Sequence, residues 1–201
     1  TVDDIGPATA SVNQNVFIDI AGTGVTTANV TSTNDSFIVL ENSGGALSTL
    51  NLEGSGNLGI MSALANSVTN INGASSTANL TLSPGTGGSS TTTGSGNDVI
   101  SLTGGANTVN TNSGQDNITA SGGTNNVNTG DGDDTITASG NLSAGDRING
   151  GNGTDTFEVI HTGLATIPST ANLTSIEQIA IQDTVHQSLD FSALTDITGV
   201  E

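Results

Sequence analysis

Aspartates at regular spacing are the residues of this chain whose types and positions most directly indicate chemistry. From Thr93 to Glu158 the sequence repeats in frames of nine residues, and the sixth position of each frame is Asp or Asn. The sixth positions are Asp98, Asn107, Asp116, Asn125, Asp134, Asp146 and Asp155. Carboxylate and carbonyl oxygens are the ligands that hard divalent cations such as Ca²⁺ prefer. Carboxylates repeated in a glycine-rich frame therefore predict cation binding.

The frame also indicates how the chain must fold to position these carboxylates. Its eighth position is apolar throughout, at Ile100, Val109, Ile118, Val127, Ile136, Ile148 and Phe157. One apolar residue in nine is too sparse for a helix face, but it suits a short strand with one inward side chain. The glycines turn the chain between strands, because glycine takes positive φ at little cost. Two frames, roughly eighteen residues, should form one coil of a β-roll.

Alternate frames should place their sixth positions on opposite edges of this roll. One edge then carries Asp98, Asp116, Asp134 and Asp155, and the other carries Asn107, Asn125 and, after a three-residue insertion, Asp146. Stacked carboxylates repel one another, and cations between them would turn the repulsion into cross-links. Neutral Asn amides can instead hydrogen-bond from coil to coil without metal. We therefore expect one metal edge, with ions bridging successive aspartates, and one largely amide edge.

The frame, seen most fully in Gly150–Glu158, resembles the nonapeptide of the RTX family, whose members leave bacteria by type I secretion and fold on meeting extracellular calcium. The resemblance implies Ca²⁺ ligands at Asp98, Asp116, Asp134 and Asp155, with one further site at Asp146. It also implies carbonyl ligands from the turns around Gly94, Gly96, Gly114, Gly130, Gly132, Gly151 and Gly153. The chain departs from the family pattern at position one, which is Thr93, Thr111 and Thr129, and at position two, which is Asn112. Asp131 and Asp133 are expected to be solvated or to lie just outside the ligands of an ion, with direct coordination of the ion as the alternative.

Composition limits the partners of the protein. The 201 residues include one Arg, no Lys and 19 acidic residues, which gives a formal charge of -18. This charge excludes nucleic acid as a partner, and no apolar run is long enough for membrane insertion. The chain lacks Cys, so an extracellular form would need a stabiliser other than disulfides, and calcium fits that role. Because the chain starts without Met and stops in mid-pattern, we expect a fragment whose export signal and anchor lie outside it.

We predict an all-β chain, a right-handed parallel β-solenoid that contains the calcium-binding roll. Residues 1–40 are a β-rich first segment, either coils or the end of a preceding β module; 41–92 are irregular parallel coils; 93–158 are the roll; and 159–201 are further coils. Apolar bursts mark strands outside the roll, at 16–18, 37–40, 50–52, 58–60, 68–71, 80–82, 176–181 and 189–191. These flanks are similar to the Thr- and Asn-rich solenoids of bacterial surface-layer (S-layer) proteins and large RTX adhesins.

Nothing in the sequence indicates catalysis, and we expect no enzyme activity. His161 and His186 have no cluster of ligand residues at metal-binding spacing, so packing or surface roles are expected for them. The string Gly54-Ser55-Gly56-Asn57-Leu58-Gly59 matches a dinucleotide fingerprint, but no strand–turn–helix pattern surrounds it.

Three functions stay open. The first is a segment of an S-layer subunit on the bacterial cell surface, which self-associates into a calcium-dependent two-dimensional lattice and contacts cell-surface polysaccharide through regions outside this chain. The second is the stalk of an RTX adhesin or biofilm protein, and the third is the calcium module of a secreted enzyme. The long Thr- and Asn-rich solenoid on both sides of a short roll favours the S-layer hypothesis.

Overall fold

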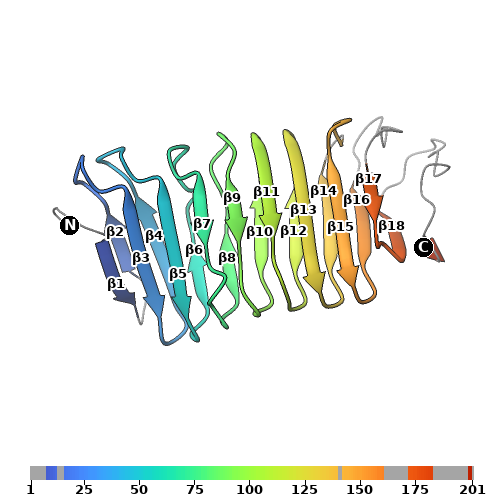
Figure 1. Ribbon diagram of the computed structural model, residues 1–201, viewed down its shortest axis with the longest axis horizontal. Helices are drawn as coiled ribbons and strands as arrows, with labels where there is room; N and C mark the ends of the chain where they lie inside the picture. The colour runs from blue at the N-terminus through green and yellow to red at the C-terminus, as the bar shows by residue number, and fades with distance from the viewer. Residues whose placement is uncertain (1–7, 13–15, 140–141, 161–171, 183–198, 201) are drawn as a thin grey trace.

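The computed structural model describes residues 8–12, 16–139, 142–160, 172–182 and 199–200, and every regular element in these ranges is a β-strand. From β1 to β18, consecutive strands alternate between two sheets that face each other, so the chain winds as a flattened coil along one axis (Figure 1). All strand pairs within the sheets are parallel. The prediction of an all-β parallel solenoid is confirmed.

The two sheets hold the strands in chain order. The first sheet contains β1 (Ala8–Val12), β3 (Thr27–Ser32), β5 (Thr49–Gly54), β7 (Asn70–Asn72), β9 (Ser90–Thr92), β11 (Ala106–Asn110), β13 (Thr124–Asp131), β15 (Arg147–Asn152) and β17 (Asn172–Thr174). The second contains β2 (Val16–Asp19), β4 (Ser36–Glu41), β6 (Leu58–Ile60), β8 (Leu80–Leu82), β10 (Val99–Leu102), β12 (Asn117–Ala120), β14 (Thr135–Ser139), β16 (Thr156–Ile160), β18 (Gln178–Gln182) and β19 (Gly199–Val200). The strands expected at 189–191 lie outside the described residues.

The nine-residue frame sets the register of the central coils. Equivalent residues of successive coils are 18 apart in the roll, 21 apart across the insertion and 20 to 22 apart in the coils before the roll. In the second sheet Ile100 pairs with Ile118, Ile118 with Ile136, and Ile136 with Phe157. The predicted apolar column is therefore continuous, because the three-residue insertion is absorbed in the turn before β15 and leaves the strands in phase.

The core is thin where the roll lies. Ile100, Ile118, Ile136 and Phe157 are fully buried, and each contributes about 1.5–3 kcal/mol from burial. Beside them the middle strands β12 and β14 add only Ala120 and Ala138, whereas β10, β16 and strands of the earlier coils such as β5 and β8 bury pairs of larger apolar side chains. The turns at the edges of the roll must therefore contribute much of the cohesion between its coils.

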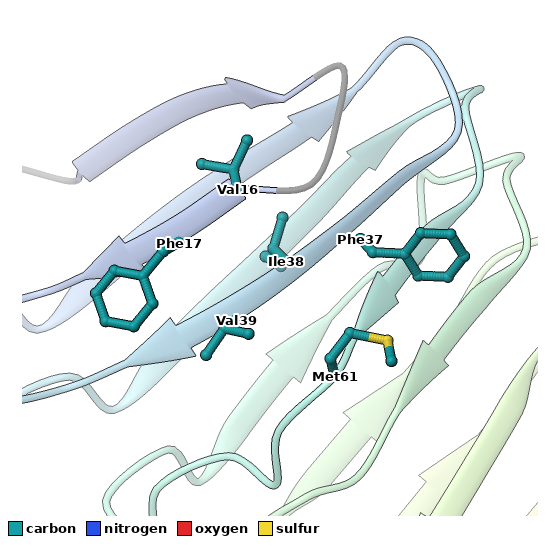
Figure 2. Close-up of a pocket in the computed structure, with 6 residues that line it drawn as sticks. All are labelled: Val16, Phe17, Phe37, Ile38, Val39 and Met61. Carbon is teal, nitrogen blue, oxygen red and sulfur yellow. The ribbon is translucent and has the colours of Figure 1, made fainter.

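One exposed patch interrupts the polar surface. Phe17, Phe37, Val39 and Met61, together with Val16 and the buried Ile38, line a depression along β2, β4 and the end of β6 (Figure 2). Phe17 is 62% exposed, Phe37 53% and Met61 65%. These side chains contribute little to the fold, because most of their area stays in water. We call this surface the apolar patch.

Candidate metal column

Four buried aspartates stack along one edge of the roll, at the turn that leads into β10, β12, β14 and β16. Asp98, Asp116, Asp134 and Asp155 are each at most 2% exposed, and we call them the aspartate column. Oδ1 of each carboxylate accepts a backbone N–H from the preceding coil: Leu80 to Asp98 (2.7 Å), Asp98 to Asp116 (2.7 Å), Asp116 to Asp134 (2.8 Å) and Asp134 to Asp155 (2.9 Å). The structure thus brings together on one edge the four aspartates that the sequence assigns to it.

The second oxygen of every carboxylate in this column lacks a partner. Oδ2 of Asp98, Asp116, Asp134 and Asp155 is buried and accepts no hydrogen bond. An ionised oxygen in that position is costly unless a proton or a cation compensates it. Burial accordingly raises the pKa of Asp98 and Asp155 to about 6 and that of Asp116 to about 7, and it also raises the pKa of Asp134. These four oxygens fit the requirement of a site for hard cations.

The column continues into a coil beyond the last nonapeptide. Glu177 Oε2 accepts the Asp155 N–H at 2.8 Å, as the Asp155 carboxylate accepts the Asp134 N–H. Pairing of Thr156 with Gln178 places Glu177 in register with Asp155. Sequence reasoning missed this residue because the glycine frame has ended there. The available signal was the position of Glu177, which directly precedes Gln178, the first paired residue of the strand that the apolar residues at 176–181 predict.

The opposite edge is a ladder of amides, as predicted. Asn107 Nδ2 donates to Asn125 Oδ1 at 3.0 Å and to the Gly104 carbonyl at 2.8 Å, and Asn125 Nδ2 donates to the Gly122 carbonyl at 3.0 Å. Asn107 Oδ1 in turn accepts the Ser89 N–H at 3.1 Å. Asparagine satisfies both its donor and its acceptor here, so this edge is held together without metal.

Asp146 lies on this second edge, but both of its oxygens have protein donors. Asn125 N–H donates to Oδ1 and Ser143 N–H donates to Oδ2, each at 2.6 Å. The Ser143 contact closes a tight turn within the insertion. Asp146 is therefore buried and satisfied, and it lacks the unpartnered oxygen that marks the aspartate column.

The glycines named from the sequence let successive coils approach closely. A Cβ on Gly114 would overlap the Gly96 carbonyl oxygen, and one on Gly132 would overlap that of Gly114. The φ angles of Gly114 and Gly132 are 131° and 142°, which side chains rarely permit. The other turn glycines meet backbone atoms of the preceding coil in the same way: Gly94, Gly96, Gly130, Gly151 and Gly153. Close stacking thus brings carbonyls of one coil directly against the turn of the next coil.

The three position-one threonines make contacts that the family pattern does not predict. All are fully buried, and their hydroxyls donate to the position-one carbonyl of the next coil: Thr93 to Thr111 (3.4 Å), Thr111 to Thr129 (2.8 Å) and Thr129 to Gly150 (2.7 Å). The same hydroxyls lie beside the carboxylates of their own frames and partly offset the rise in carboxyl pKa. Asn112, at position two, has φ of 64° and donates from Nδ2 to the Thr93 carbonyl.

A second, exposed series of polar side chains links the same turns from outside. Asn79 N–H donates to Asn57 Oδ1 at 3.0 Å, Asn97 N–H to Asn79 Oδ1 at 2.8 Å, and Thr154 N–H to Asp133 Oδ1 at 2.8 Å. Asp131 is also exposed, and its Oδ1 accepts from Asn152 Nδ2 at 2.7 Å. Asp131 and Asp133 are thus solvent-exposed, and their contacts serve coil stacking.

The remaining candidate groups give no site within the part of the chain that the structure describes. His161 and His186 lie outside the described residues. Residues 54–59 run from the end of β5 through a short turn at 55–57 into β6, so a strand and not a helix follows the first glycines of this string. Within the described ranges, no three His, Cys, Asp or Glu side chains group around a point that could hold a metal, so any cation at the column would need carbonyl ligands as well. The same ranges contain no helix that could cross a bilayer.

Comparisons with known proteins gave no match: no family model fits the chain, and no curated protein or solved structure shows significant similarity to it.

Proposed function

We propose that this chain is a calcium-stabilised structural segment of a bacterial S-layer subunit of the RTX type. The observation that carries the proposal is the aspartate column, in which four stacked carboxylates each bury an oxygen without a partner. Bound Ca²⁺ supplies the positive charge and the oxygen coordination that these carboxylates require. Asp98, Asp116, Asp134 and Asp155 would hold the ions, together with turn carbonyls of the roll.

The residues of the chain itself prepare this site. Backbone N–H groups hold one oxygen of each carboxylate and leave the other buried without a hydrogen-bond partner. The glycines let the turns of neighbouring coils stack closely, and at Gly150 the Ser175 carbonyl oxygen and Asp155 Oδ2 converge on one space. Because the apolar core of the roll is thin, the coils around the aspartate column need this additional cohesion, and binding of calcium should be coupled to their folding.

The surface of the protein also bears on association between copies of the chain, as distinct from cohesion between the coils of one copy. With a charge of -18, copies repel one another at low calcium, and divalent cations reduce that repulsion. The apolar patch offers a contact that does not depend on charge, since three of its side chains are more than half exposed. Exposed apolar patches mark interaction surfaces, and we assign this one to a second copy of the chain, an assignment that rests on the proposed lattice role.

Electron microscopy of the purified chain in millimolar calcium tests the proposal, with sedimentation in calcium and in chelator beside it. We expect ordered arrays or oligomers with calcium and monomers without it. Sodium chloride at matched ionic strength is the control, because it screens charge without bridging oxygens. Equal association in sodium and calcium, or none in the full-length protein with calcium, would refute the lattice role and favour an adhesin stalk.

A further inference from the structure

A series of threonine hydroxyls lies beside the aspartate column and ends one coil before the last aspartate of the column, Asp155. Thr93, Thr111 and Thr129 each give a hydroxyl hydrogen to the carbonyl of the next coil. The next position-one residue is Gly150, which has no side chain to continue the series. The Gly150 carbonyl accepts a hydrogen bond from the Thr129 hydroxyl at 2.7 Å, but Gly150 has no hydroxyl that could donate to the coil that follows.

Two oxygens converge on the space that a Gly150 side chain would occupy. A Cβ built there would overlap the Ser175 carbonyl oxygen and Asp155 Oδ2. Asp155 is fully buried and its Oδ2 has no hydrogen-bond partner. In the three threonine frames a hydroxyl lies beside the corresponding carboxylate. The space between Gly150 and Asp155 is lined by these two oxygens, and no position-one hydroxyl lies beside the Asp155 carboxylate.

Glu177 brings a second carboxylate to this place. Its Oε2 accepts the Asp155 N–H at 2.8 Å, so the two acids belong to adjacent coils of one column. A buried carboxylate oxygen, a main-chain carbonyl and a neighbouring glutamate form an oxygen set that hard divalent cations prefer. At the threonine frames, the hydroxyls already satisfy the equivalent carbonyls, so a cation gains less from binding them.

We propose that the tightest cation site of the chain is at Gly150, Asp155, Ser175 and Glu177. The sites beside Thr93, Thr111 and Thr129 are weaker, because each threonine hydroxyl already donates a hydrogen bond to the carbonyl that would otherwise bind the cation. This inference rests on the proposed calcium binding and assigns an order to its sites. It also adds Glu177 and the Ser175 carbonyl, which lie beyond the nonapeptide frames, to the residues that hold the ion.

Equilibrium dialysis of the whole chain against calcium tests this order, because it counts bound ions directly at each free concentration. We expect the wild type to bind one ion at least about tenfold more tightly than the rest, a difference of about 1.4 kcal/mol. Asp155→Asn should remove that ion, whereas the matched variant Asp98→Asn, at the other end of the column, should keep it. Thr129→Gly removes the hydroxyl beside Asp134 and should create a second tight ion.

The possible results separate this inference from the proposal beneath it. A single class of equivalent ions, or loss of the tight ion in Asp98→Asn and not in Asp155→Asn, would overturn the order of sites while leaving calcium binding in place. An unchanged number of tight ions in Thr129→Gly, with the chain still folded by circular dichroism, would overturn the role given to the hydroxyls. No bound calcium in the wild type would refute both.

Discussion

Replacing Asp116 by Asn should change the stability of the protein in opposite directions with and without calcium. Asp116 lies between two other carboxylates of the column and is 2% exposed. Its Oδ1 accepts the Asp98 N–H, which an Asn oxygen can also do, and its Oδ2 has no partner. An amide group in that place carries no charge, and by analogy with Asn107 its NH₂ can donate to the carboxylate of the next coil.

The size of the effect follows from the cost of the buried charge. Burial raises the pKa of Asp116 from 3.8 to about 7, roughly three units, each worth about 1.4 kcal/mol. The ionised Asp116 carboxylate therefore destabilises the folded state by at most about 4 kcal/mol. Because of solvent screening and joint titration of the neighbouring carboxylates, we expect about 2–4 kcal/mol. In chelator at about pH 8, Asp116→Asn should be more stable than the wild type by this amount. In saturating calcium it should be less stable by at least about 2 kcal/mol, because two bridging positions lose a ligand.

Urea unfolding followed by far-UV circular dichroism measures both differences. At a slope of about 1–3 kcal/mol per molar urea, the midpoint in chelator should rise by roughly 1–2 M. Asp131→Asn is the control for removal of one negative charge, because Asp131 is exposed in the same turn region. A variant that is less stable than the wild type in chelator at about pH 8 would show that the Asp116 charge is compensated within the protein, and the reasoning would fail.

Further predictions concern pH, the core, the turns and the patch. In chelator the stability should be highest near pH 4 and fall as the pH rises to about 7, because folding raises the pKa of Asp98 and Asp155 from 3.8 to about 6 and that of Asp116 to about 7; a flat or rising profile by urea titration would contradict this. Ile118→Ala should cost about 2–5 kcal/mol by denaturation in calcium, whereas Val99→Ala, 44% exposed on the outer face, should cost under about 1 kcal/mol; similar losses would refute the assigned inward face. Gly132→Ala should lower the thermal midpoint in calcium and weaken calcium binding, because its Cβ meets the Gly114 carbonyl; unchanged affinity by dialysis would show that this turn does not shape the site. Phe37→Ser should leave the unfolding midpoint nearly unchanged and reduce calcium-dependent sedimentation of oligomers; intact assembly would remove the apolar patch from the lattice contacts.

Much of the fold could be predicted because the nine-residue period couples local and global structure. Each frame contains its own strand and its own turn, and the frame repeats without a slip from Ile100 to Ile136. Glycine positions fix where the chain turns, and the single apolar position fixes which way the strand faces. The alternation of Asp and Asn therefore predicted two distinct edges, and the structure places these residues on two edges with the amide ladder as expected.

The chemistry of individual sites needed the tertiary structure, because it depends on contacts between coils that are 18 to 22 residues apart. Sequence alone gives Asp155 and Asp146 the same position in the frame, yet one has an unpartnered oxygen and the other has two donors. Glu177 has no frame around it and joins the column only through strand pairing. In the sequence, Thr93, Thr111 and Thr129 are only departures from the glycine of the nonapeptide pattern. The stacking of the coils shows that their hydroxyls donate to carbonyls of the next turn. The repeat thus determined the path of the backbone, which needs only local period and turn residues, whereas the stacking of one coil on another decided which oxygens are satisfied and which are left for a cation.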